Sequence, residues 1–290
     1  MGAAGLIRAE AVLAWWEAQR RELPWRETRD PWAVLVCEVM AQQTQVARVA
    51  ERWAPFLERF PTPGSCAEAP VAEVLRRWTG LGYNRRAVNL HRCAVAVVER
   101  HGDQLPESLA ELRALPGIGP YTARALLAFA FEQDAAVVDT NTARVLARWA
   151  GRRLSATEAQ AAADGALPAG EAWAWNQALL DLGAAVCTRR APRCDHCPVP
   201  EHCTWARAGA PAPDPAEGSA GVSVPQSRFA GSDRQGRGRL VEALRGRAVP
   251  ERDLAGVMGW HDDPTRAVLV AQTLVRDGLA VRTADGFELP

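Results

Sequence analysis

Residues 111–144 read E-L-R-A-L-P-G-I-G-P-Y-T-A-R-A-L-L-A-F-A-F-E-Q-D-A-A-V-V-D-T-N-T-A-R. This stretch predicts a helix, a tight hairpin, a second helix, a short extended run and an acidic residue that opens another helix. Gly117 and Gly119 permit positive φ and Pro116 disfavours helical geometry before it, so the first helix must stop there. The hairpin therefore directs backbone N–H groups outward at a helix start, where anions bind. A plain helical hairpin is the alternative.

Composition limits the classes of function. The chain has 290 residues, enough for one large or two modest domains with a sizeable core. No apolar run approaches the roughly 20 residues of a membrane span, so we expect a cytoplasmic protein without membrane contact. The formal net charge is zero, and composition alone does not indicate a nucleic-acid binder. All 34 basic residues are arginine, which excludes an enzyme that forms a Schiff base on a lysine side chain.

Residues 30–46 read D-P-W-A-V-L-V-C-E-V-M-A-Q-Q-T-Q-V and predict a helix that begins at Pro31. Trp32, Leu35 and Val39 form part of its apolar stripe, with Glu38 close by. A carboxyl group among apolar neighbours should have a raised pKa, which suits a general acid at neutral pH. A surface glutamate on a helix edge is the alternative.

Residues 78–86 read W-T-G-L-G-Y-N-R-R, with an aromatic residue next to glycine and followed by paired arginines. This composition suits a loop pressed against a phosphate backbone. Tyr83 could insert into a base stack, as intercalating side chains do. It could equally be a core aromatic residue beneath a turn.

Four of the seven cysteines are crowded into one segment, with the spacing C-x6-C-x2-C-x5-C. Four thiolates in so short a run bind a soft metal centre, either zinc or iron–sulfur. Zinc modules usually come as two C-x2-C pairs with a longer linker, and this uneven run does not fit that template. The predicted metal ligands are Cys187, Cys194, Cys197 and Cys203.

These motifs together, over residues 6–205, resemble the MutY-type adenine DNA glycosylases of the helix-hairpin-helix, endonuclease III superfamily. The resemblance is carried by L-P-W-R, E-V-M-x-Q-Q-T-Q-V, L-P-G-I-G…V-D-T-N-x-x-R and the cysteine loop. It implies a mostly α fold, with a six-helix barrel and an iron–sulfur helical domain that holds a [4Fe–4S] cluster. It also implies a base excision repair enzyme that hydrolyses the N-glycosidic bond of adenine mispaired with 8-oxoguanine or guanine.

The resemblance assigns roles to individual residues. Glu38 would protonate the adenine ring, Asp139 would face the sugar, and Asn141 would position the attacking water with Glu38. Tyr121 stands where bifunctional relatives carry a lysine that attacks the sugar, so we expect no lysine-dependent lyase activity. The residues expected to contact DNA or line the base pocket are Trp25, Arg26, Gln42, Gln43, Tyr83, Gly117, Gly119 and Gln177.

The same interpretation divides the chain into domains. Residues 1–25 and 132–207 would form the split iron–sulfur domain, and 26–131 the barrel domain. Residues 208–236, rich in Ala, Pro, Gly and Ser, would form a linker. Residues 237–290 predict three helices and a hairpin, a small winged-helix-like module that could contact DNA or protein. Better-known relatives mostly end in a Nudix-like domain that inspects 8-oxoguanine, so opposite-base preference stays open.

Two other functions remain open. One is a glycosylase of the same fold that removes thymine, uracil or an alkylated base. The other is a non-enzymatic DNA-damage-binding or regulatory protein, although a pure binder has no use for both Glu38 and Asp139. The expected partner is double-stranded DNA containing mispaired adenine. We expect a monomer with a bacterial-type, nucleoid-associated activity.

Overall fold

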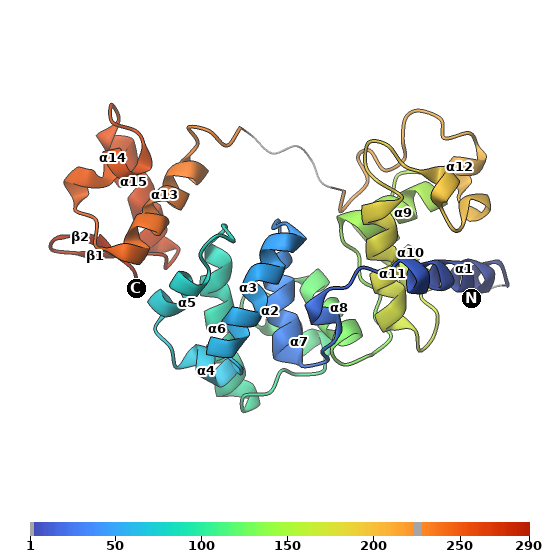
Figure 1. The fold of residues 1–290 in the computed structure, drawn as a ribbon, viewed down its shortest axis with the longest axis horizontal. Coiled ribbons are helices and arrows are strands. Elements are labelled where there is room, and N and C mark those ends of the chain that lie inside the picture. Colours follow the sequence, from blue (N-terminus) through green and yellow to red (C-terminus); the bar gives the residue numbers. More distant parts are fainter. Residues whose placement is uncertain (1–2, 223–227) are drawn as a thin grey trace. The chain divides into compact units, whose positions relative to one another are not determined.

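The computed structural model describes residues 3–222 and 228–290, which are mostly helical, as predicted (Figure 1). The helices are α1 (Ala3–Gln19), α2 (Pro31–Ala41), α3 (Val46–Arg59), α4 (Pro63–Ala67), α5 (Val71–Arg77), α6 (Arg85–His101), α7 (Leu109–Ala114), α8 (Pro120–Phe129), α9 (Thr140–Ala150), α10 (Ala156–Ala166), α11 (Ala172–Ala185), α12 (Thr204–Arg207), α13 (Asp233–Gly246), α14 (Leu254–Met258) and α15 (Pro264–Arg276). Short 3-10 turns are η1 (Pro24–Arg26), η2 (Cys194–His196), η3 (Pro200–His202) and η4 (Glu251–Asp253). The strands β1 (Val281–Thr283) and β2 (Gly286–Glu288) pair antiparallel. Within the described parts of the chain, no helix combines the length and apolarity of a membrane span.

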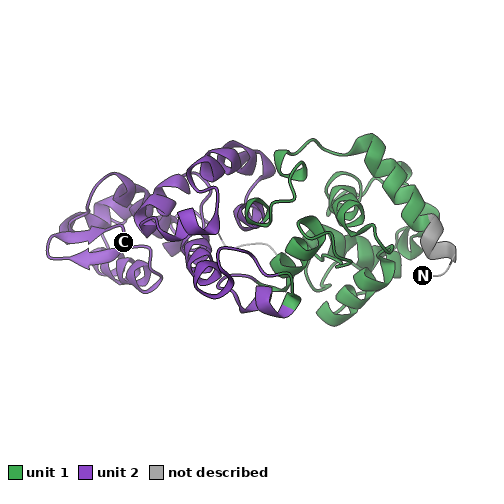
Figure 2. Cartoon of the chain, turned by 90° about the horizontal axis from the view of Figure 1, so that it is seen from below, with its two compact units in different colours: residues 1–34, 107–109, 119–225 green, residues 35–106, 110–118, 226–290 purple. Residues whose placement is uncertain are grey.

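The chain forms two compact units, each discontinuous in sequence (Figure 2). The first unit comprises residues 1–34, 107–109 and 119–225, and the second comprises 35–106, 110–118 and 226–290. Compared with the predicted boundaries, α8 and residues 208–225 group with the first unit, and residues 237–290, predicted as a separate module, group with the second.

Tryptophans dominate the core of the first unit. Trp16 of α1 and Trp175 of α11 are almost fully buried, and α11 also packs on α9. Large aromatic side chains contribute most of the burial energy in such a core. The buried Asn176 donates to the carbonyls of residues 135 and 172 and accepts from the amide of Val137 at 2.8 Å. The extended run before α9 is thereby fixed against α11.

In the second unit, α6 is the central helix and packs against α4 and α5. Phe56 contacts both Phe60 and Trp78 edge-on, with ring centroids 4.9 and 5.9 Å apart. Thr62 and Ser65 form a capping box at the start of α4, which satisfies two otherwise unpaired amides. These contacts give the loops at the ends of α2 and α5 a rigid base.

The C-terminal module consists of α13, α14, α15 and the β1–β2 hairpin, as predicted. However, α13 begins at Asp233, inside the stretch predicted as a linker. Ser232 caps the helix by accepting from the amide of Gln235. Glycines normally disfavour a helix, which is why the sequence does not predict the first turn of α13. A Cβ on Gly236 would lie 2.3 Å from the Trp260 ring, so tertiary packing requires glycine there.

Candidate functional site

Asp139 is the N-cap of α9, as predicted from its position after the extended run. Its Oδ1 accepts from the amides of Asn141 at 2.8 Å and Thr142 at 2.7 Å, and its Oδ2 accepts from the Asn141 side chain at 2.9 Å. Burial raises the pKa of Asp139 above its ordinary value, although these donors oppose the effect. The result is a half-buried carboxyl group with a fixed orientation.

The buried Arg144 connects this turn to the cysteine segment. Its guanidinium donates to the Asn141 Oδ1 at 2.9 Å, to the carbonyl of Gly183 at 2.6 Å and to that of Cys187 at 2.7 Å. A Cβ on Gly183 would lie 2.6 Å from the Asn141 Cβ and 2.9 Å from its carbonyl carbon and oxygen. Helix α11 therefore packs directly against the backbone that carries the Asp139 turn.

The four predicted metal ligands line one cavity, together with apolar residues of α9 and α11. They are Cys187, Cys194, Cys197 and Cys203. No group of three or more His, Cys, Asp or Glu side chains among the described residues is arranged to hold a metal ion. The shared apolar cavity nevertheless places four soft sulfur donors around one space, the donor set that iron–sulfur clusters use.

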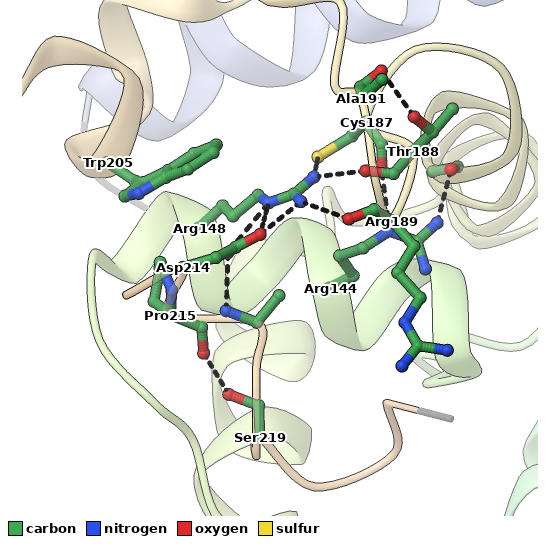
Figure 3. A network of polar contacts seen from close by, with 12 residues as sticks. Arg144, Arg148, Cys187, Thr188, Arg189, Ala191, Trp205, Asp214, Pro215 and Ser219 are labelled. Carbon is green, nitrogen blue, oxygen red and sulfur yellow. Dashed lines mark hydrogen bonds and ion pairs between the residues drawn. The ribbon is translucent and has the colours of Figure 1, made fainter. Parts of the chain in front are cut away.

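Arg148 lies against this cavity and is only 1% exposed. Figure 3 shows its guanidinium between Cys187 and Asp214. It donates to the Cys187 Sγ at 3.2 Å and to the Thr188 carbonyl at 2.9 Å, and its guanidinium carbon lies 4.8 Å from the Trp205 ring centroid. Asp214 accepts from Arg148 at 2.5 Å. Burial raises the pKa of Asp214, but Arg148 and a backbone amide lower it by more, so Asp214 favours the ionised form.

Asp214 lies in the predicted linker, so this part of the prediction needs correction. The hydroxyl of Ser219 donates to the carbonyl of Pro215 at 2.7 Å and accepts from the amide of Leu154 at 3.1 Å. Residues 214–219 are thus folded onto the first unit beside the cysteine cavity.

In the second unit, Gln43 and Tyr83 occupy the two turns predicted to enter DNA. Both have positive φ, 55° and 45°, a region that non-glycine residues seldom adopt. Tyr83 is 41% exposed, which excludes the alternative of a core aromatic residue. Strained, exposed positions of this kind are often functional, and they persist only when the surrounding structure holds them.

Arg86 donates to both turns, a role that the local sequence does not indicate. It was expected to face a phosphate beside Arg85, but its side chain is buried. It donates to the carbonyls of residues 39, 40 and 42 at 2.6–2.8 Å, and to those of Leu81 and Gly82 at 3.0 Å. Burial lowers the pKa of Arg86 to about 10, so it remains charged at neutral pH.

The hairpin residues Pro116, Gly117 and Ile118 line a small cavity with Gln42 and Arg86. Gly117 has φ of 79°, and a Cβ there would lie 2.9 Å from the Asn89 Cβ. Gly119 is the N-cap of α8, with a proline at the first helical position. The predicted stop of α7 and start of α8 are confirmed. Glu38 is half-buried on α2.

The remaining predicted site residues lie in the first unit. Arg26 is buried and donates to both carboxylate oxygens of Asp181, at 2.9 and 3.0 Å, so its charge is paired. Gln177, one turn before Asp181 on α11, is buried, while Trp25 in η1 and Tyr121 in α8 are half-buried. Glu38 and Asp139 belong to different units.

Comparison with known proteins identifies the family. Residues 36–167 match the model of the HhH-GPD superfamily base excision DNA repair proteins. An adenine DNA glycosylase of Mycobacterium tuberculosis is 42% identical over 289 residues, covering 96% of this chain and 92% of the relative. An adenine DNA glycosylase of Homo sapiens is 40% identical over 212 residues, covering 67% of this chain and 38% of the relative.

A solved thermostable thymine-DNA glycosylase is similar with a TM-score of 0.66 and 27% identity, over 71% of this chain and 97% of its own. The mycobacterial similarity covers nearly the whole chain and therefore includes most of the C-terminal module. The protein belongs to the adenine DNA glycosylases, within the HhH-GPD superfamily.

Proposed function

We propose that this protein is a monofunctional glycosylase that hydrolyses the N-glycosidic bond of adenine mispaired with guanine or 8-oxoguanine in duplex DNA. One observation carries the proposal: Asp139 is a half-buried helix cap whose carboxylate is fixed by three donors at the position that the family uses to face the sugar. The similarity to adenine DNA glycosylases over nearly the whole chain supports the choice of base.

Binding begins with the hairpin. Backbone amides around Gly117 and Gly119 bind a phosphate at the start of α8. Gln43 and Tyr83 enter the duplex, and the adenine leaves the stack. Extrusion costs a few kcal/mol, and less at a mismatch than at a normal pair. A pair that is already weakened is therefore extruded preferentially.

Bond cleavage uses two carboxyl groups with different roles. Glu38 donates a proton to the purine ring, which makes adenine a better leaving group. Asp139, as the carboxylate, stabilises the positive charge that develops on the sugar. Asn141 orients the attacking water with Glu38, and Tyr121 lies near the sugar. Trp25, Arg26, Gln42 and Gln177 line or support the base pocket. Because the chain has no lysine side chain, the abasic product is not cleaved by the lysine route.

We assign a [4Fe–4S] cluster to Cys187, Cys194, Cys197 and Cys203. The shared apolar cavity and the buried Arg148 beside the Cys187 Sγ support this assignment. The cluster supplies a covalent cross-link for the segment that follows α11, and hydrolysis requires no electron transfer from it. The protein should be brown, with absorbance near 400 nm, and a colourless preparation that contains zinc would contradict the assignment. The enzyme is expected to act as a monomer on nucleoid DNA.

The decisive experiment is a single-turnover product assay on duplexes with adenine opposite 8-oxoguanine and opposite guanine. Alkali treatment reveals abasic sites, and untreated samples test for lyase activity. We expect strand breaks only after alkali. Release of thymine from a T·G duplex without release of adenine would favour the same-fold alternative, and no release of any base would favour a non-enzymatic binder.

Replacing Glu38 with Gln removes the proton donor while keeping the size of the side chain. We expect Glu38→Gln to bind mismatched duplex DNA nearly normally and to lose adenine release by at least ~10²–10⁴-fold. Binding by fluorescence anisotropy and excision under single-turnover conditions measure the two properties separately. Retained excision would remove Glu38 from the mechanism.

A further inference from the structure

A cavity of about 890 Å³ lies within the second unit, between the two turns that carry Gln43 and Tyr83 and the C-terminal module. Residues 42–45 and 80–86 form one wall. The opposite wall is formed by α13 and the residues around it, with Phe229, Arg234 and Arg237. The module therefore faces the same space as the turns proposed to enter DNA.

The module is fixed to the rest of the second unit by specific contacts. Arg245 of α13 donates to the Leu75 carbonyl and to the Asn84 side chain, both at 3.0 Å. The amide of Ala72 donates to the carbonyl of Pro290 at 3.1 Å. Asn84 directly follows Tyr83, so Arg245 connects α13 to the turn itself. These contacts hold the two walls of the cavity, called the groove below, in place within the second unit.

The charge of the groove favours an anion. Among the described residues, its lining includes five arginines and no carboxylate. Arg86 is engaged by backbone carbonyls, and Asp277 nearby pairs with Arg237 at 2.5 Å and with Arg85 at 3.6 Å. The other two arginines of the lining are Arg48 and Arg234. An arginine-lined groove without lining carboxylates suits a phosphodiester backbone.

The groove also presents two aromatic rings. Tyr83 is 41% exposed and Phe229 is 54% exposed, so both rings are accessible to a ligand. Each lies near an arginine: Arg86 is 5.6 Å from the Tyr83 ring centroid, and Arg234 is 5.5 Å from that of Phe229. Aromatic rings interleaved with arginines bind nucleic acid by stacking on bases while the cations contact phosphates.

We propose that this groove binds the undamaged DNA strand opposite the extruded adenine, with Phe229 and Arg234 contacting the strand directly. The assignment rests on the proposed function. Gln43 and Tyr83 fill the gap that an extruded base leaves, so the base opposite that gap lies next to them. Both residues line the groove, and α13 is the element that faces them. The module thereby contributes to the choice of opposite base.

The test compares the double variant Phe229→Ala, Arg234→Ala with Arg252→Ala. Arg252 is 85% exposed in the same module but outside the groove, so it controls for charge loss. Both are made in the Glu38→Gln background, and the Glu38→Gln chain without further change is the reference, so that binding is measured without turnover. Circular dichroism confirms that each remains folded.

We expect the groove variant to bind a duplex with adenine opposite 8-oxoguanine roughly 5- to 100-fold more weakly, the range for losing one stacking contact. Its salt dependence should fall by about one released counterion. In hydroxyl-radical footprinting, protection of the undamaged strand opposite the adenine should be lost while protection of the adenine strand remains. The Arg252→Ala control should show the full footprint of both strands.

Equal affinity and unchanged protection of the undamaged strand in the groove variant would overturn the inference. Loss of protection on the adenine strand alone would also overturn it, because the groove would then bind the other strand. Failure of the proposed function is a different result: the chain with Glu38 intact would release no adenine from any duplex, whatever the footprint.

Discussion

The turn at Asp139 and the turns at Gln43 and Tyr83 are built in opposite ways. Asp139 has relaxed, extended backbone angles, and its carboxylate is held by several donors on a helix packed in the core. Gln43 and Tyr83 have strained backbone angles and exposed side chains. The buried cation Arg86 donates to carbonyls of both turns, and Trp78 and Arg245 add further hydrogen bonds to the second turn.

The difference matches what each region has to do. A group that stabilises charge must be in place before the reaction, and its orientation should not relax. A group that enters a duplex must be presented to solvent, where little can support it directly. In this protein Gln43 and Tyr83 lie in turns that the neighbouring Arg86 stabilises. The hydrogen bonds from its guanidinium to the turn carbonyls offset the backbone strain at these two residues.

Among the changes that test this comparison, Asp139→Asn should have the largest effect. Asparagine is as good a helix cap as aspartate, so this variant keeps the bonds from the two backbone amides. It removes the charge and the oxygen that accepts from the Asn141 side chain. We expect the single-turnover rate to fall ~10²–10³-fold. Excision on the adenine·8-oxoguanine duplex measures it, and a rate near that of the unsubstituted protein would show that the residue is only a structural cap.

The same variant should not unfold more easily. Because the pKa of Asp139 is raised in the folded protein, the fold favours the neutral form, and that preference is lost as pH rises through the folded pKa. At neutral pH the buried charge of Asp139 lowers the stability of the fold, and removing that charge offsets the loss of the bond from the Asn141 side chain. Thermal unfolding at pH 7 should give a melting temperature equal to or above that of the unsubstituted protein.

Arg86→Met tests the other side of the comparison. Methionine keeps much of the volume but removes the guanidinium that donates to carbonyls of both turns. Leaving buried acceptors unsatisfied should lower the free energy of unfolding by at least about 3 kcal/mol. Urea denaturation measures this change, and Arg85→Met, which removes an exposed arginine next to it, is the matched control. Equal losses in both variants would contradict the role of Arg86.

Gly183→Ala should lower the free energy of unfolding by less than Arg86→Met does. It acts on the turn that carries Asp139. The added methyl group would overlap Asn141 and must displace the start of α9. Overpacking of this kind destabilises by about 1–3 kcal/mol. We expect a reduced excision rate with unchanged affinity for mismatched duplex DNA. Gly165→Ala is the control, because a Cβ on Gly165 meets no atom within 4 Å.

The smallest effect is a shift in the pH profile. Asp139 acts as a carboxylate, so the single-turnover rate should fall as pH decreases through its pKa. Since burial raises that pKa, this acidic limb should lie above the value of about 3.9 typical of a free aspartate. In Asp139→Asn the limb should disappear from the residual activity. A limb that persists there would belong to another group.

Much of the rigid region could be predicted from sequence, because its signals are local. Asp139 after an extended run, glycines in the hairpin and four closely spaced cysteines each specify a structure over a few residues. Arg86 could not be distinguished from Arg85 in this way. Its burial depends on carbonyls of residues 39–42, more than forty positions away in the chain.

Two further structural features, the folded segment around Asp214 and the start of α13, could not be predicted for the same reason. The Ala-, Pro- and Gly-rich composition around Asp214 indicates a linker, whereas contacts with the buried Arg148 and with Leu154 hold this segment on the first unit. Gly236 disfavours a helix, but the Trp260 ring packs so closely against it that no larger residue fits there. In each case a contact between distant segments overrides the local preference.

The chain contains only two tyrosines, one exposed on a strained turn and the other in the first turn of α8. Biosynthetic incorporation of fluorotyrosine would thus place two fluorine labels at Tyr83 and Tyr121 and nowhere else. Each resonance could be assigned with one substitution. The protein thereby carries natural positions for spectroscopic probes that would follow duplex entry and base release separately, in real time.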